Sequence, residues 1–266
     1  MKGRKKVKRD KANYVIQSVT HAFDVLEEFR GDIDELGVTD LSKKLKLHKN
    51  NVFRILATLE SRGYIEQNKA TENYRLGLKA LELGQNFIYQ MGLLKQARAI
   101  LEQLVLDTGE TGYISILRDK EVVYLDACEA KKTVRIVPRV GYRLPPYCTA
   151  SGKCLIAFES IDELEKSLPK ELKKYTKNTI TDRKKFLEHL KQVQSEGFAL
   201  DNEEFENEVK CAAAPIRDYT RRVVGTISIS GPASRLSDKY VKEEIVPKVV
   251  KAANGISKRL GFGTAI

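Results

Sequence analysis

The sequence predicts an α+β protein in which an N-terminal winged helix-turn-helix precedes a larger domain of helices covering an antiparallel sheet. Two observations lead to this fold class. Apolar residues recur every three or four positions in stretches between residues 14 and 62, which is the spacing of amphipathic helices. From residue 112 onward, short runs rich in Val, Ile and Tyr alternate with further helical stretches. A chain of 266 residues is long enough for two such domains.

Composition narrows the class of protein. The formal net charge of +11 indicates an anionic partner, and residues 1–13 form a basic arm that either contacts DNA or is unstructured. No run reaches the roughly 18 apolar residues of a membrane span, and the N-terminus lacks the apolar core of a secretion signal. The four cysteines follow no CxxC spacing, which is typical of reduced thiols in a cytoplasmic protein.

Residues 14–77 carry the pattern of a winged helix-turn-helix domain. We expect a first helix from about Tyr14 to Phe29, a short second helix starting at Thr39, and a third from about Lys49 to Arg62. Two short strands around a polar turn then form the wing. The apolar residues expected to face inward are Val15, Val19, Ala22, Phe23 and Leu26 in the first helix and Val52, Ile55, Leu56 and Leu59 in the third.

The outer face of the third helix predicts contacts with double-stranded DNA. In the major groove Arg pairs with guanine and Asn with adenine, and side chains of both kinds lie near the start of this helix. A three-helix bundle with a hairpin is the alternative interpretation, but the ordered set of helices and wing favours DNA binding. Lys69, at the tip of the wing, is expected to touch a phosphate. The contacts predicted on the helix itself are Lys49, Asn50, Asn51, Arg54 and Thr58.

Residues 78–92 are predicted to form a helical linker. Several of their apolar side chains, among them Leu78, Leu81 and Phe87, have no evident place in the first domain. Packing against the same helix of a second chain would bury them, so we expect the linker to take part in dimerisation. A dimer would also match the paired half-sites that helix-turn-helix proteins bind.

Residues 93–266 are predicted to form the second domain. We expect a helix from about Leu94 to Leu106, a hairpin over residues 112–125, and a strand over residues 134–137. Helices follow over residues 151–159 and 182–195, and a second hairpin pairs residues 211–217 with 223–230 before a helix over 238–260. This mixture indicates a small-molecule-binding sheet domain rather than a doubly wound sheet.

Several longer motifs resemble the IclR family of bacterial regulators over residues 14–262. In the first domain the resemblance lies in residues 48–63, HKNNVFRILATLESRG. In the second it lies in PYCTASGK at residues 146–153, EGFALDNEE at residues 196–204 and CAAAPI at residues 211–216. Many members carry His where this chain carries Cys148.

The resemblance implies a GAF-like effector-binding domain, a homodimer or dimer of dimers, and binding to palindromic operators. It also implies an effector pocket, and the residue chemistry agrees: serines two apart on a strand share a face, and a helix N-terminus favours an anion such as a small carboxylate. The effector would shift the dimer between arrangements that do or do not fit the operator. The pocket residues implied are Ala150, Ser151, Asp201, Cys211, Ser228 and Ser230.

Two other functions fit some of the same residues. An enzyme using Cys148 or Cys211 as nucleophile would need a base, but two of the three histidines lie in the first domain and His189 lies on a Lys-rich helix expected at the surface. We therefore expect no enzymatic activity and no required cofactor. Metal-responsive regulation is the alternative, with Cys148, Asp201 and Cys211 converging on Zn²⁺.

Overall fold

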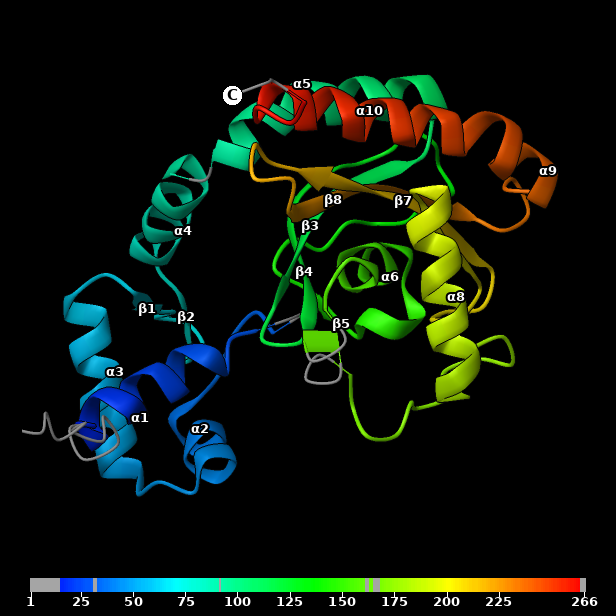
Figure 1. Ribbon diagram of the computed structural model, residues 1–266. Coiled ribbons are helices and arrows are strands. Elements are labelled where there is room, and N and C mark those ends of the chain that lie inside the picture. The colour runs from blue at the N-terminus through cyan, green and yellow to red at the C-terminus, as the bar shows by residue number, and fades with distance from the viewer. Residues whose placement is uncertain (1–14, 31–32, 91, 161–162, 165–167, 264–266) are drawn as a thin grey trace, which may run out of the picture. The chain divides into compact units, whose positions relative to one another are not determined.

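The computed structural model describes residues 15–30, 33–90, 92–160, 163–164 and 168–263. The chain divides into two compact units, residues 1–87 and residues 88–266, and each is treated by itself below (Figure 1). The predicted basic arm, residues 1–13, lies outside the described residues. Among the residues that the structure describes, no helix is both long enough and apolar enough to cross a membrane.

Unit 1 has the order of elements expected of a winged helix-turn-helix. Its helices are α1 (Gln17–Glu27), α2 (Val38–Leu45) and α3 (Lys49–Ser61), and the wing is formed by β1 (Ile65–Gln67) and β2 (Tyr74–Leu76). The turn between α2 and α3 begins at Lys46, which adopts the left-handed conformation and ends α2. The core joins one residue or more from every element: Val25, Leu41, Val52, Leu56, Ile65 and Tyr74.

The predicted inward face of the first helix is wrong for three of its five residues, whereas Ala22 and Leu26 pack against the core as expected. Val15, Val19 and Phe23 remain 66%, 48% and 60% exposed, whereas Val25 is fully buried. The helix carries two apolar stripes, and the one through Val25 and Phe29 packs against α2 and α3. Periodicity alone could not decide which stripe faces the core. The other stripe is left on the surface.

Helix α4 (Leu78–Gln90) covers most of the predicted linker. Leu78, Leu81 and Leu83 are all exposed on this helix. Unit 1 therefore does not bury these side chains, as we expected for the linker.

Unit 2 is built on a six-stranded antiparallel sheet with strand order β5-β4-β3-β8-β7-β6. Two long hairpins lie at its centre, β3 (Thr111–Arg118) with β4 (Glu121–Cys128) and β7 (Val209–Arg217) with β8 (Val223–Pro232). The short strands β5 (Arg143–Leu144) and β6 (Ala199–Asn202) form its edges.

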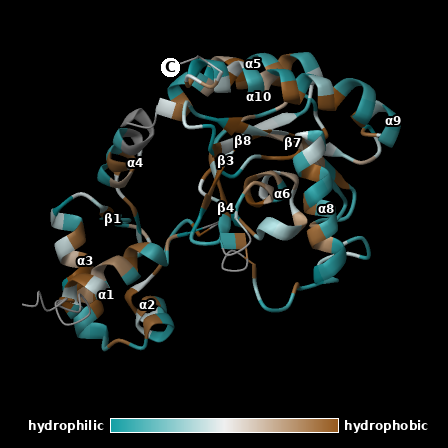
Figure 2. Cartoon of the chain, viewed as in Figure 1, coloured by the Kyte–Doolittle hydropathy of each residue, from teal (hydrophilic) through white to brown (hydrophobic). Residues whose placement is uncertain are grey.

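The two faces of this sheet differ in chemistry because successive side chains point to opposite sides. One face carries Ile114, Ile227, Ile229 and Ile216, and it packs against α5 (Gly92–Thr108) and α10 (Val246–Arg259). The opposite face carries small and polar residues and is covered by α6 (Ala150–Ala157) and α8 (Arg183–Glu196) (Figures 1 and 2). Small side chains on this second face allow α6 to lie close to the strands.

One irregularity interrupts the pairing of β3 with β4. Ile114 pairs with Asp126, but the next residue, Ser115, pairs with Tyr124, so Leu125 is an extra residue in β4. As a result, Asp126 and Tyr124 project to opposite faces of the sheet, whereas residues two positions apart in a regular strand project to the same face.

The predicted strand over residues 134–137 is wrong, since this stretch has no regular structure and belongs to an irregular loop of residues 129–142. Its backbone is held by side chains instead of a strand, with Thr111 Oγ1 donating to the Ile136 carbonyl (2.7 Å) and Arg235 to the Val134 carbonyl (2.9 Å). The C-terminal helix is found in three consecutive pieces: α9 (Asp238–Tyr240), the π turn η3 (Val241–Ile245) and α10.

Candidate functional sites

Unit 2 contains a cavity of about 480 Å³ between the polar face of its sheet, the start of α6 and the irregular loop of residues 129–142. The structure brings all six residues of the predicted pocket into its lining: Ala150, Ser151, Asp201, Cys211, Ser228 and Ser230. Sequence reasoning missed most of the rest of the lining, which includes Tyr113, Tyr124, Arg135, Arg139, Tyr142 and Glu206.

Helix α6 places its first turn at the cavity. The turn is capped by Thr149, whose Oγ1 accepts from the Gly152 N–H (3.2 Å) and donates to the Pro145 carbonyl (3.1 Å). A Cβ on Gly152 would lie 2.3 Å from Pro146 Cα, so only glycine permits this close approach of the preceding turn. First-turn N–H groups lack acceptors within their own helix, and together with the helix dipole they favour an anion.

A row of polar side chains faces this helix from three neighbouring strands. Asp201 on β6 is directly opposite Cys211 on β7, which is opposite Ser230 on β8. Cys211 Sγ lies 2.9 Å from Ser230 Oγ, and Ser228 follows two residues earlier on the same face. Burial raises the pKa of Asp201 to about 7, with the Lys153 charge and the Glu204 N–H opposing that rise. The row therefore offers hydrogen-bonding groups suited to ligand hydroxyls.

An aromatic and cationic wall completes the cavity. Tyr113 and Tyr124 stack with ring centroids 4.3 Å apart, and burial raises the pKa of both phenols. Arg139 lies over the Tyr142 ring, 5.7 Å from its centroid. Tyr113 is opposite Ser228 in the sheet, so the alternation of β3 was a signal that could have identified it. The arginines come from the irregular loop, whose path no local pattern indicates.

Buried Glu110 anchors this loop. Its carboxylate accepts two hydrogen bonds from Arg235, both 2.7 Å, and forms an ion pair with Lys132 (3.0 Å). Arg235 in turn donates to Val134 in the loop. The loop thus has a fixed ionic attachment near its start.

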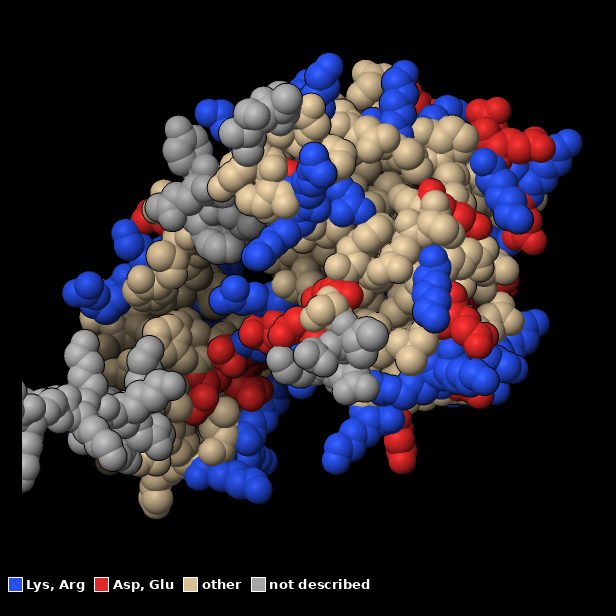
Figure 3. All heavy atoms as spheres, viewed as in Figure 1, with Lys and Arg blue, Asp and Glu red and all other residues tan. Residues whose placement is uncertain are grey.

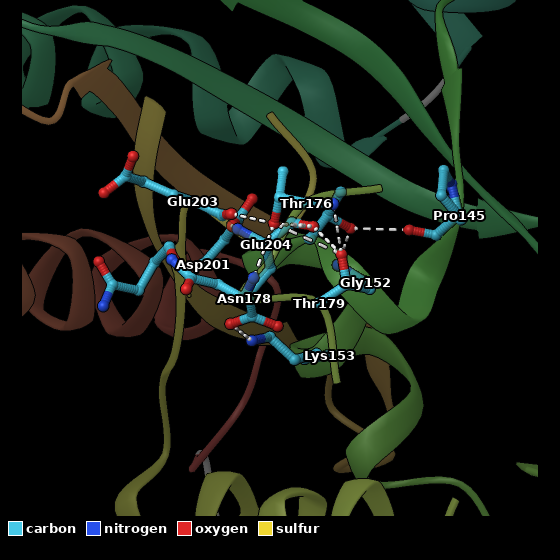
Figure 4. Close-up of polar contacts among 11 residues, drawn as sticks. Pro145, Gly152, Lys153, Thr176, Asn178, Thr179, Asp201, Glu203 and Glu204 are labelled. Carbon is cyan, nitrogen blue, oxygen red and sulfur yellow. Dashed lines mark hydrogen bonds and ion pairs between the residues drawn. The ribbon is translucent and has the colours of Figure 1, made fainter. Parts of the chain in front are cut away.

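Behind the cavity lies a buried polar network, drawn in Figure 4. Lys153 of α6 pairs with Glu204 (2.5 Å), and the N–H of Glu204 donates to Asp201 Oδ1 (2.7 Å). Thr179 Oγ1 donates to the Glu204 carbonyl (2.6 Å), and Thr176 Oγ1 donates to the Glu203 carbonyl (2.6 Å). The network connects the α6 side of the cavity to Asp201 on the strand side.

The metal alternative gains no support from this arrangement. Among the described residues, no group of three or more His, Cys, Asp and Glu side chains is placed to hold a metal ion. Asp201 and Cys211 line the cavity and Cys148 does not. Burial raises the pKa of both thiols, which disfavours the thiolate that Zn²⁺ requires. His189 also differs from expectation, because it is half-buried, its Nε2 has no hydrogen-bond partner among the described residues, and burial lowers its pKa.

In unit 1, every residue predicted to contact DNA is exposed: Lys49, Asn50, Asn51, Arg54, Thr58 and Lys69. Thr58 Oγ1 donates to the Arg54 carbonyl (2.8 Å), which leaves its oxygen free to act as an acceptor. Lys69 lies in the turn between β1 and β2, where Glu35 accepts from Asn68 and from Thr71, both 2.6 Å. Glu35 was missed by sequence reasoning, and it fixes the wing to the loop before α2.

The exposed stripe of α1 borders an apolar groove within unit 1. The groove is lined by α1, α3 and α4, with Val19, Phe23, Phe53 and Leu83 supplying apolar surface. Three of the predicted DNA contacts, Asn51, Arg54 and Thr58, also lie along it.

Comparison with known proteins decides the family. The profile "Bacterial transcriptional regulator IclR C-terminal" matches residues 85–258, and "IclR helix-turn-helix domain" matches residues 18–69. The chain belongs to the IclR family. The IclR-family regulator XynR of Escherichia coli (strain K12) is 34% identical over 249 residues, which are 93% of this chain and 98% of XynR.

Solved structures of IclR-type regulators share the fold. A transcriptional regulator of Rhodococcus sp. RHA1 superposes with a TM-score of 0.84 at 28% identity, covering 92% of this chain and 98% of its own. An IclR homologue of Microbacterium hydrocarbonoxydans, complexed with 4-hydroxybenzoate, gives 0.81 at 22% identity, covering 91% and 98%. The predicted α+β class with a winged helix-turn-helix is confirmed, and this IclR-family chain is a DNA-binding regulator of transcription rather than an enzyme.

Proposed function

We propose that this regulator binds a palindromic operator through α3 and the wing, and that a small hydroxylated carboxylate in the unit 2 cavity controls this binding. One observation carries the effector half of the proposal: the capped N-terminus of α6 and the row Asp201, Cys211 and Ser230 border the same cavity. A carboxylate group suits the helix N-terminus, and hydroxyl groups suit the row.

For the operator, we propose that Asn50, Asn51 and Arg54 read bases while Lys49, Thr58 and Lys69 contact the backbone. The amide and guanidinium groups are the ones that recognise adenine and guanine edges, and all are exposed on the first two turns of α3. A regulator that binds duplex DNA would work where the genes lie, so we propose a cytoplasmic location.

The functional unit is proposed to be a homodimer that uses the linker α4 and the exposed stripe of α1, leaving Asn51, Arg54 and Thr58 of α3 to the DNA. Two such dimers are proposed to form a dimer of dimers. Val19, Phe23 and Leu83 are exposed on α1 and α4, and a contiguous apolar surface of this kind is typical of protein contacts. Two copies would present two α3 helices to the two halves of a palindrome.

A thermal-shift screen of the full-length protein tests the effector. The panel contains sugar acids, short keto acids and hydroxy acids, and aromatic acids including 4-hydroxybenzoate. A ligand that binds only the folded state raises the free energy of unfolding, by about 2.7 kcal/mol when its concentration is a hundred times Kd. The melting temperature rises as a result. We expect hits among hydroxylated carboxylates and none among the matching amides, which lack the charge.

The double variant Ser228→Ala/Ser230→Ala provides the control. It removes two hydroxyls from the cavity wall while leaving the helix N-terminus and unit 1 unchanged. We expect it to bind DNA as before and to lose the thermal shift. An unchanged shift would remove these serines from the site, and amides that bind as well as the acids would contradict the carboxylate.

A further inference from the structure

A basic surface lies on unit 2, away from the cavity lining. Between Lys170 and Lys191 the chain carries eight Lys or Arg residues against three acidic residues, a net charge of +5. Figure 3 shows blue side chains gathered around the lower end of α8 and the loop beside it. We call the following exposed lysines the α8 basic surface: Lys170, Lys173, Lys174, Lys177, Lys184, Lys185 and Lys191.

These lysines are close together in the chain, and the structure gives them no acidic partner among the described residues, although some other lysines do have one. Lys44, Lys132 and Lys248 each form an ion pair of 3.0 Å or less. None of the seven lysines of the α8 basic surface has an ion pair with any residue that the structure describes. Their charges are therefore available to an external anion.

The start of α8 concentrates the charge further. Arg183, Lys184 and Lys185 occupy its first turn, where the helix dipole is already positive and acidic residues are preferred. Asp182 is engaged as the N-cap, accepting from the Lys185 N–H (2.9 Å). Three cations at this position destabilise an isolated helix slightly, and a bound polyanion would offset the repulsion.

The backbone that carries these lysines is fixed. Thr176 and Thr179 are buried and bond to the carbonyls of Glu203 and Glu204, and Tyr147 Oη donates to the Lys173 carbonyl (3.0 Å). The charges thus project from a backbone tied to the core of unit 2 (Figure 4). A surface with fixed charge spacing loses less entropy on binding than a free loop does.

We propose that the α8 basic surface is a second contact with duplex DNA, independent of sequence, made by the effector unit. Duplex DNA carries one negative charge per roughly 1.7 Å of its axis. Closely spaced phosphates of this kind are a suitable partner for a surface of closely spaced lysines. Lysines act as point charges toward phosphates and read no bases, so the contact adds affinity without specificity.

The test compares two quadruple variants of the full-length protein. The first carries Lys→Gln at Lys174, Lys177, Lys184 and Lys185, and the matched control carries the same change at the exposed Lys95, Lys242, Lys251 and Lys258. Both lose four charges, and unchanged melting curves establish that both fold. The probe is a random-sequence duplex of about 40 base pairs, long enough to extend past a helix-turn-helix footprint.

Binding is measured by fluorescence anisotropy over a series of salt concentrations. The magnitude of the slope of log Kobs against log salt falls by about 0.9 for each phosphate contact removed. We therefore expect this magnitude to be smaller by about two to four in the surface variant. The control variant should lose less than about one. Equal slopes for the two variants would overturn the proposal. So would a surface variant that loses binding to polyglutamate but not to DNA, because the partner would then be an acidic protein.

Discussion

Lys153 Nζ lies 2.5 Å from Glu204 Oε1, and their side chains are 0% and 8% exposed. The pair joins α6, whose first turn borders the cavity, to the segment whose N–H holds Asp201. The other oxygen of Glu204 is buried without a partner among the described residues. Removing two charges from water is costly enough that such pairs add little net stability. We infer that this pair serves to fix the spacing between two walls of the cavity.

Replacing one member of this pair should be strongly destabilising. Lys153→Met leaves the Glu204 carboxylate buried and unpaired, with an expected loss of about 3–5 kcal/mol in the free energy of unfolding. Urea denaturation followed by circular dichroism measures it. The double variant Lys153→Met/Glu204→Leu removes both charges and should recover most of the loss. A double variant no more stable than the single one would mean that packing, and not the unpaired charge, governs the site.

The stability of the protein should depend on pH through Asp201. Its pKa is raised to about 7 in the folded state from its ordinary value near 4, so its contribution to stability is present below pH 4 and is lost as the pH rises through 7. Asp201→Asn keeps an acceptor for the Glu204 N–H and removes the charge. The melting temperature of this variant relative to the unmodified protein should rise between pH 4 and pH 8. A difference that is constant over this range would contradict the assignment.

Arg54 should contribute to sequence recognition. Arg54→Ala removes an exposed guanidinium from α3, and we expect a loss of about 1–3 kcal/mol together with relaxed preference at one base pair. Operators recovered by in vitro selection with each protein, followed by titration, provide the measurement. Arg62→Ala, beyond the last turn of the same helix, is the control for charge alone. A weakening that is equal on all sequences would restrict Arg54 to the phosphate backbone.

Phe23 should contribute to the dimer. Its ring is exposed on the α1 stripe, and Phe23→Asp would place a charge in the proposed contact without disturbing the core of unit 1. Light scattering after size exclusion should show a monomer, and operator affinity should fall because half-sites are then bound singly. Tyr219→Asp changes an equally exposed ring on unit 2 and should leave the mass unchanged. A dimeric Phe23→Asp protein would exclude the α1 stripe as the interface.

The sequence predicted best what is decided locally. The limits of α3 and the shared face of Ser228 and Ser230 follow from periods of 3.6 and 2, and both are found in the structure. The stripe of α1 was misjudged because two stripes satisfied the same period, and only packing against α2 and α3 selects one. The arginines of the cavity wall could not be predicted, because the loop that supplies them is attached through Glu110 to Arg235, 125 positions away, whereas the alternation of β3 could have identified Tyr113.

The extra residue in β4 changes the side on which successive residues of this strand project. Tyr124 and Asp126 are two positions apart and would share a side in a regular strand, yet Asp126 pairs with Arg98 on α5 while Tyr124 stacks on Tyr113 in the cavity. Deleting Leu125 would make the two residues adjacent, and regular alternation would then keep Tyr124 on the cavity side and Asp126 on the α5 side. Leu125 belongs to the apolar cluster on the other face. A strand can thus gain one core residue between two fixed side chains while the wall that it presents to the ligand stays unchanged.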